Sequence, residues 1–201
     1  MTRFLLVRHA PPDPAWQPES RLCGWYDPPL GEAGRALAWT LADSLRRFEA
    51  DAVYASPLQR AWQTAEPIAR ALALDLQPAH GLREISCGEV DGMRLNEVQA
   101  RYPGHWERNL RQTEAEFRWP GGESYAEFRQ RVGAALDTLA ARHDRESLIV
   151  VAHTGVVTQV FGMLHGWNAA RWDRRRPEHA GITVVEWDGG RPLRVTASGR
   201  T

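Results

Sequence analysis

Two histidines and two arginines stand at positions where they could handle a phosphate group. His9 and His153 each follow a short apolar stretch directly. Arg8 adjoins His9, and Arg60 comes shortly after a third apolar stretch. A neutral imidazole is nucleophilic near pH 7, and forked guanidinium groups suit a tetrahedral oxyanion. Together they predict phosphoryl transfer through a phosphohistidine, with the arginines and the second imidazole stabilising the transferred charge.

Each of these residues also has a less specific interpretation. A histidine after a strand is most often a loop residue, and Arg60 by itself is most often a surface residue. Two strand-terminal histidines could instead bind zinc. The adjacent Arg8 argues against zinc, because a cation beside a metal ion is unfavourable. A leaving alkoxide would also need a proton donor, which a nearby carboxylic acid can supply.

The elements that must position these residues follow from the apolar pattern. Short continuous apolar runs predict buried strands at residues 2–7, 51–55 and 147–152. Helical spacing predicts helices at residues 31–48, 94–102, 125–143 and 156–164, and a turn at 188–190 predicts a C-terminal hairpin. The alternation predicts a three-layer α/β/α fold, with a mostly parallel central sheet and helices on both faces. Such sheets bind ligands beyond the C-terminal ends of their strands.

Three local features refine this outline. Ser56 is predicted to be an N-cap, with Pro57 at the first position of a helix that runs through Arg60. Pro67 is predicted to kink or end that helix, because proline removes an amide donor. Residues 103–122 are predicted to be irregular and to form a lid or a pocket wall.

Composition limits the class of protein. The chain has 201 residues, which we interpret as one domain over 1–201, with 43% hydrophobic and 25% charged residues. A net charge of zero gives no indication of a general nucleic-acid or membrane partner, so we expect neither. All 25 basic residues are arginine, and the run 174–176 is more typical of a solvated face than of an anion site.

The cysteines and the N-terminus indicate a location. Cys23 and Cys87 form no plausible zinc set and fit reduced thiols. The apolar run before His9 is too short for a signal peptide or a membrane span. We therefore expect a cytoplasmic protein.

These residues lie in motifs that resemble branch 1 of the histidine phosphatase superfamily, which has the phosphoglycerate-mutase-like fold. The resemblance covers most of the chain, and the motifs occur in the family's order. They are residues 6–10 (LVRHA, family L-V-R-H-G), 24–30 (GWYDPPL, G-x-x-D-x-P-L), 56–65 (SPLQRAWQTA, S-P-L-x-R-A-x-Q-T-A), 82–92 (LREISCGEVDG, L-x-E-x-x-x-G-x-x-x-G), 121–124 (GGES) and 151–155 (VAHTG, V-x-H-x-G).

The resemblance implies a role for each matching residue. His9 would be the phosphorylated nucleophile, and Glu84 would be the general acid that later activates water. The phosphate would be bound by Arg8, His9, Arg60, His153 and Thr154. Glu89 and Asp91 are the alternative acids. The family implies no metal and no cofactor.

Departures from the family pattern fall around the substrate site. Ala15 stands where many members have an asparagine that touches phosphate, and Asp13, Gln17 or Arg21 are candidates to replace it. Cys23 stands where many members have glutamine. We predict substrate contacts at Arg21, Cys23 and Gly24.

The predicted function is therefore hydrolysis of small phosphomonoesters through a phosphohistidine on His9. The resemblance includes α-ribazole phosphatase-like and broad-specificity members. A phosphoglycerate mutase is the alternative enzyme, and an inactive scaffold that binds phosphate esters is the alternative from another class. The expected partner is a small phosphorylated metabolite. The sequence leaves the oligomeric state open, a dimer included.

Overall fold

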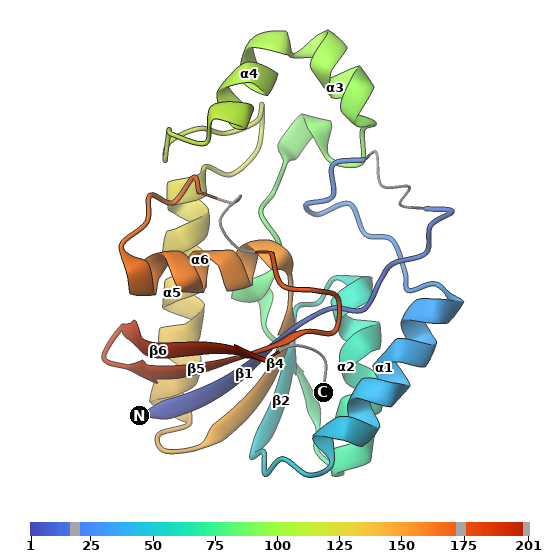
Figure 1. Cartoon of the computed structure of the whole chain (residues 1–201), viewed down its shortest axis with the longest axis vertical. Helices are drawn as coiled ribbons and strands as arrows, with labels where there is room; N and C mark the ends of the chain where they lie inside the picture. Colours follow the sequence, from blue (N-terminus) through green and yellow to red (C-terminus); the bar gives the residue numbers. More distant parts are fainter. Residues whose placement is uncertain (17–20, 172–175, 199–201) are drawn as a thin grey trace.

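The computed structural model describes residues 1–16, 21–171 and 176–198, and it confirms the predicted three-layer α/β/α fold (Figure 1). Within these residues a six-stranded sheet has the order β3-β2-β4-β1-β5-β6. The strands are β1 (Thr2–Arg8), β2 (Ala52–Ala55), β3 (Leu76–Pro78), β4 (Ser147–Ala152), β5 (Ile182–Asp188) and β6 (Arg191–Ser198). Strands β1 to β4 are parallel to one another, whereas β5 is antiparallel to its two neighbours, β1 and β6.

Helices cover both faces of the sheet (Figure 1). One layer holds α1 (Glu32–Leu45) and α2 (Gln59–Leu72), and the other holds α5 (Tyr125–Arg142) and α6 (Thr154–His165). Strand β1 serves both layers, because successive side chains of a strand point to opposite faces. Phe4 and Leu6 join the core under α5 and α6, while Leu5 and Val7 join the core under α1 and α2.

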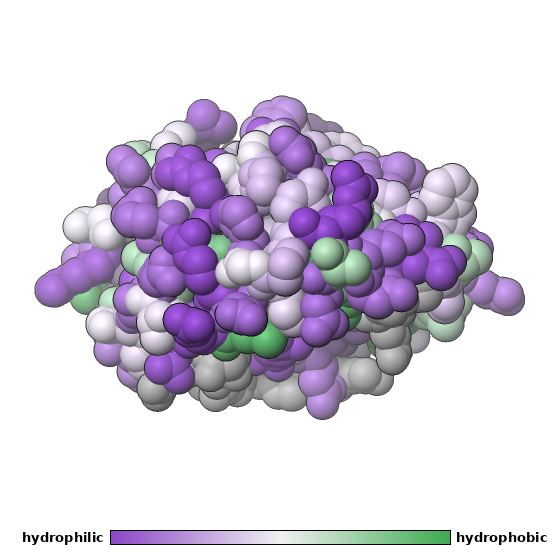
Figure 2. All heavy atoms as spheres, turned by 90° about the horizontal axis from the view of Figure 1, so that it is seen from above, coloured by the Kyte–Doolittle hydropathy of each residue, from purple (hydrophilic) through white to green (hydrophobic). Residues whose placement is uncertain are grey.

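Two short helices, α3 (Leu95–Arg101) and α4 (Pro103–Arg111), lie away from the sheet at one end of the molecule (Figure 1). Two 3₁₀ turns, η1 (His80–Leu82) and η2 (Gly88–Val90), precede them. Seen from this end, the surface is mostly hydrophilic, with small and scattered apolar spots (Figure 2). This face therefore offers no broad apolar patch.

Several local predictions were wrong. Helix α2 begins at Gln59 with Leu58 as its N-cap, so Ser56 is not the cap. Pro67 lies inside α2, so it does not end the helix as one of its two predicted effects required. Neighbours such as Ile68 pack into the core, and this burial stabilises the helix despite the missing hydrogen bond.

The stretch 103–122 is not irregular throughout, since α4 occupies its first half with Pro103 in its first turn. Helix α4 has no fully buried residue, and Trp106 and Leu110 are its only large apolar side chains, which are too few to give a clear helical spacing in the sequence. Strand β3 was missed because three residues carry no periodic signal.

Among the described residues, no helix has both the length and the apolar character that crossing a bilayer requires.

Candidate active site

The register of the sheet places His9 and His153 side by side. Arg8 pairs with Ala152 at the C-terminal ends of β1 and β4, and the His9 amide donates to the Ala152 carbonyl over 2.9 Å. The two imidazole rings that follow have centroids 5.2 Å apart. Both side chains are buried, with 6% of His9 and none of His153 exposed. Residues distant in sequence therefore form one imidazole pair at the predicted edge of the sheet.

The hydrogen bonding of His9 selects its tautomer. Nδ1 lies 2.8 Å from the Ala10 carbonyl oxygen, and a carbonyl can only accept, so Nδ1 carries the proton. The lone pair is then on Nε2. Burial lowers the pKa of His9 well below its usual 6.5, and the charge of Arg60 lowers it further. His9 is thus a neutral imidazole at neutral pH with a nucleophilic Nε2.

Arg60 is almost fully buried, with 1% exposed, and a loop holds its guanidinium. It donates to the Tyr26 carbonyl over 2.9 Å and to the Gly24 carbonyl over 2.8 Å. A guanidinium has five N–H donors, so others remain for an anion. A Cβ at Gly24 would collide with the Ile85 carbonyl, so only glycine fits this approach. The predicted substrate residue Gly24 therefore supports Arg60 through its carbonyl.

Arg8 is half-buried and is held by the segment before β5. Its guanidinium donates to the Pro177 carbonyl over 2.7 Å and lies 3.0 Å from Nε2 of His179. Nδ1 of His179 lies 2.9 Å from the His9 carbonyl. Sequence reasoning missed His179. The sequence predicted the C-terminal hairpin but not that β5 pairs antiparallel with β1, and this pairing is what places the residue before β5 at the edge where the parallel strands end.

Glu84 lies in the loop between η1 and η2 and is buried, with 7% exposed. Its carboxylate accepts from the Ile85 amide and from the Gly155 amide, each over 3.0 Å. Burial raises the pKa of Glu84 above its usual 4.5, and these two hydrogen bonds oppose the rise. The positive charges of Arg60 and Arg8 also lower the pKa of Glu84, and so oppose the effect of burial. The environment thus favours a carboxylic acid that can donate a proton.

His153 is fixed from behind by Ser56, with Nε2 of the ring 2.8 Å from the hydroxyl oxygen. Its Nδ1 is buried and has no hydrogen-bond partner among the described residues. Burial lowers the pKa of His153 well below 6.5. Thr154 follows as the first residue of α6, partly buried, so the N-terminal amides of the helix begin at the site.

The two alternative acids have other partners. The Asp91 carboxylate accepts from the backbone amides of Gly24 and Tyr26 over 2.8 and 2.9 Å, and also from those of Trp25 and Cys87. It therefore organises the loop that holds Arg60. Glu89 is exposed and accepts from the Tyr102 hydroxyl over 3.2 Å. Neither matches the buried position of Glu84 beside Arg60.

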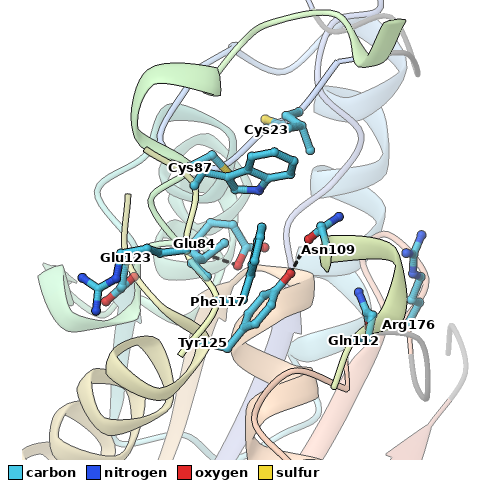
Figure 3. Close-up of a pocket in the computed structure, with 13 residues that line it drawn as sticks. Cys23, Glu84, Cys87, Asn109, Gln112, Phe117, Glu123, Tyr125 and Arg176 are labelled. Carbon is cyan, nitrogen blue, oxygen red and sulfur yellow. Dashed lines mark hydrogen bonds between the residues drawn. The ribbon is translucent and has the colours of Figure 1, made fainter. Parts of the chain in front are cut away.

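A cavity of about 190 Å³ opens beside Glu84 (Figure 3). Aromatic rings and polar side chains line it together with both cysteines: Leu22, Cys23, Glu84, Ile85, Cys87, Asn109, Gln112, Phe117, Arg118, Trp119, Glu123, Tyr125 and Arg176. The Tyr125 hydroxyl donates to Asn109 over 2.5 Å, which joins the core helix α5 to α4 (Figure 3). The cavity thus lies between the α3–α4 end and the buried acid.

The predicted substrate residues divide between this cavity and its surroundings. Cys23 lines the cavity, and burial raises the pKa of its thiol to about 11. Arg21 donates to the Gly92 carbonyl over 2.6 Å and does not line the cavity. Asp13 accepts from the Ala15 amide over 2.9 Å. Gln17 and two of the three consecutive arginines, Arg174 and Arg175, lie outside the described residues, whereas Arg176 lines the cavity.

The described part of the chain holds no group of three or more His, Cys, Asp or Glu side chains arranged to bind a metal ion. The chemical parts present are a neutral nucleophilic imidazole, a second imidazole, two guanidinium groups and a buried carboxyl group whose pKa is raised. That set can transfer a phosphoryl group and protonate the leaving oxygen.

Comparison with known proteins gives matches over almost the whole chain. The family model of the histidine phosphatase superfamily (branch 1) matches residues 4–198. Phosphoserine phosphatase 1 of Hydrogenobacter thermophilus is 33% identical over 189 residues, which cover 94% of this chain and 88% of that protein. A Salmonella paratyphi C protein named "Probable phosphoglycerate mutase GpmB" is 31% identical, covering 93% of this chain and 86% of its own length.

Among solved structures, Bacillus stearothermophilus YhfR superposes with a TM-score of 0.88 at 27% identity. The superposition covers 100% of this chain and 98% of that chain. The similarity therefore extends through the sheet, both helical layers and the α3–α4 end.

Proposed function

The chain belongs to branch 1 of the histidine phosphatase superfamily, and from this premise we propose that it hydrolyses small phosphomonoesters through a phosphohistidine on His9. The observation that carries the proposal is the imidazole pair of His9 and His153, with ring centroids 5.2 Å apart. The guanidinium of Arg60 and the acid Glu84 are buried beside that pair.

In the first step, Nε2 of His9 attacks phosphorus and the bond from phosphorus to the ester oxygen breaks. Glu84 transfers its proton to that oxygen, so the leaving group departs as an alcohol. Arg8, Arg60 and the Nδ1 side of His153 stabilise the charge on the other phosphate oxygens.

In the second step, the Glu84 carboxylate takes a proton from water, and the resulting hydroxide attacks phosphorus. The bond between Nε2 and phosphorus breaks and its electron pair returns to the ring. The products are inorganic phosphate and the starting enzyme, with Glu84 protonated again. Each residue thus ends the cycle in the state in which it began.

The cavity beside Glu84 supports a small leaving group. Phe117, Trp119 and Tyr125 offer apolar ring surface, while Asn109 and Arg176 offer polar contacts. Phosphoserine belongs at the head of a substrate screen, because a 33% identical relative is named phosphoserine phosphatase 1. α-Ribazole phosphate and a panel of sugar phosphates complete the screen, which ranks esters by kcat/KM.

The decisive experiment measures phosphate release from p-nitrophenyl phosphate in the presence of EDTA. We expect release to persist, because cationic side chains stand where a metal would otherwise stabilise the phosphate charge. His9→Ala should abolish both turnover and the phosphohistidine seen by mass spectrometry after rapid quenching. Turnover retained by His9→Ala would refute the assignment of the nucleophile.

A phosphoglycerate mutase is the second candidate, supported by the 31% identity to the protein named GpmB. Incubation with 3-phosphoglycerate separates the two activities. Formation of 2-phosphoglycerate faster than phosphate release would favour the mutase. A scaffold without activity would form no phosphohistidine with any ester in the screen. A cytoplasmic location and a small phosphorylated metabolite as partner remain predictions.

A further inference from the structure

His179 lies at the edge of the sheet where His9 and His153 lie, but it precedes its strand, whereas they follow theirs. Strand β5 runs antiparallel to β1, so the residues before β5 lie where β1 ends. The Arg8 amide donates to the Gly181 carbonyl over 3.1 Å, and the Ala180 amide donates to the Arg8 carbonyl over 2.9 Å. The ring of His179 lies 5.2 Å from the ring of His9, centroid to centroid. His9 is therefore flanked by an imidazole on each side.

Both ring nitrogens of His179 face groups of fixed hydrogen-bonding character. Nδ1 lies 2.9 Å from the His9 carbonyl oxygen, which can only accept, so Nδ1 carries a proton. Nε2 lies 3.0 Å from a terminal nitrogen of Arg8, which can only donate, so Nε2 presents its lone pair. These partners together select one neutral tautomer, in which His179 bridges the nucleophile's backbone and the neighbouring guanidinium.

The same segment orients Arg8 at a second point. The other terminal nitrogen donates to the Pro177 carbonyl over 2.7 Å. The Nε of Arg8 is buried and has no hydrogen-bond partner within the described chain. Two outer contacts thus fix the plane of the guanidinium while its remaining donors stay available to an oxyanion.

We propose that His179 is a positioning residue, which holds the Arg8 guanidinium and the His9 backbone in the geometry that receives the phosphoryl group. The proposal rests on the proposed function for its catalytic consequence. Its structural basis is that the two nitrogens of one ring have different partners: Nδ1 donates to the His9 carbonyl, and Nε2 accepts from Arg8. Loss of the bridge should weaken phosphate binding through Arg8 before it affects folding.

Amide side chains can separate the two halves of the bridge. In His179→Asn, the amide nitrogen can take the place of Nδ1 and donate to the His9 carbonyl, but nothing reaches Arg8. In His179→Gln, the amide oxygen can take the place of Nε2 and accept from Arg8. His179→Ala removes both contacts. His80→Gln is the matched control, because His80 is an exposed histidine in η1.

The primary readout is calorimetric binding of inorganic phosphate, accompanied by KM and kcat on p-nitrophenyl phosphate. We expect His179→Ala to weaken phosphate binding and raise KM about ten- to hundredfold, as for a lost hydrogen bond to a charged group. His179→Gln should recover most of that loss and His179→Asn little of it. In an Arg8→Ala background, His179→Ala should add much less than it does in wild type, because only the contact with the His9 carbonyl is left to lose.

Equal phosphate affinity in wild type and His179→Ala would overturn the proposal, and so would full additivity with Arg8→Ala. Equal defects in the Gln, Asn and Ala variants would also overturn it, because they would indicate packing alone. Thermal unfolding of each variant identifies one that fails to fold. If that is the Ala variant, the comparison of His179→Gln with His179→Asn carries the test. A wild type that binds phosphate but hydrolyses no ester would defeat the proposed function and leave the role of His179 testable by binding.

Discussion

The backbone amide of Gly155 donates a hydrogen bond to the Glu84 carboxylate, with the two atoms 3.0 Å apart. Gly155 lies in the first turn of α6, just after His153, whereas Glu84 comes from the loop between η1 and η2. The proposed proton donor is therefore attached to the segment that carries the second imidazole. The amide stabilises the carboxylate form and so moderates the rise in the pKa of Glu84 that burial causes.

The first prediction concerns the proton donor. Glu84→Gln should lower kcat/KM on an alkyl phosphate about 10²- to 10⁴-fold, since kcat/KM reports the step in which the alkoxide leaves, and that alkoxide then receives no proton. The loss should be much smaller on p-nitrophenyl phosphate, whose nitrophenolate leaves without one. Steady-state kinetics on both esters check this, with Glu89→Gln as a carboxylate control that should keep its activity. An equal loss on the two esters would contradict the role of Glu84.

The second prediction is a bell-shaped dependence of kcat/KM on pH for an alkyl phosphate, whose leaving oxygen needs a proton. His9 must be neutral, so activity falls on the acid side as His9 takes up a proton, well below 6.5. Glu84 must be protonated, so activity falls on the alkaline side through the pKa that burial raises above 4.5. In Glu84→Gln the alkaline limb should disappear and the acid limb should stay. An alkaline limb unchanged in that variant would assign it to another group.

The third prediction concerns stability against pH. Burial lowers the pKa of His9 and His153 well below 6.5, so the unfolded chain binds protons that the folded chain does not. The stability that these neutral rings contribute is present above 6.5 and is lost as pH falls towards the folded-state pKa values. Each ring should contribute up to about 1.4 kcal/mol per pH unit in that window.

Glu84 acts with the opposite sign, because its raised pKa removes stability as pH rises through the folded-state value. The histidine contribution is therefore measured in a Glu84→Gln background, by urea unfolding at a series of pH values. His9→Gln in that background should flatten the slope. A slope that stays unchanged would show that His9 titrates alike in the folded and unfolded chains.

The fourth prediction concerns the hydroxyl behind the second imidazole. Ser56→Ala should destabilise the protein by about 1 kcal/mol and should raise KM, because the His153 ring loses the partner 2.8 Å from its Nε2. Thermal unfolding and KM on p-nitrophenyl phosphate measure the two effects. Ser44→Ala is the control, since that hydroxyl bonds to Thr40 within α1, and its KM should not change. A KM unchanged in Ser56→Ala would mean that His153 needs no such support.

The fifth prediction concerns the loop that holds Arg60. Gly24→Ala should destabilise by about 1–3 kcal/mol, because the added methyl group meets the backbone carbonyl of Ile85. The Gly24 carbonyl should also move away from Arg60, so phosphate binding should weaken. Gly104→Ala provides the control, because a Cβ there meets nothing within 4 Å and alanine favours the helix α4. If Gly24→Ala bound phosphate with wild-type affinity, this loop would not be needed to position Arg60 for phosphate binding.

Much of the fold follows from local pattern. Strand β4 and helix α5 were predicted almost to the residue, because a continuous apolar run and a strong helical spacing are properties of neighbouring residues. Helix α4 was missed because it has only two large apolar side chains, Trp106 and Leu110, and Ser56 was misassigned as a cap because Ser-Pro before a helix has that signature. Local rules describe what a segment prefers, whereas the Ser56 hydroxyl contacts both the nearby Leu58 amide and the distant His153 ring.

The sequence by itself determined the chemistry of this protein, because residue type sets it: imidazoles, guanidinium groups and a carboxyl within recognisable motifs. Only the tertiary structure decided which groups meet. It buried Glu84 against Gly155, left Glu89 at the surface, gave Asp91 to backbone amides, and brought His179 to Arg8. The physical reason is that strand order, strand direction and register arise from packing between segments far apart in the chain, and no local pattern records them.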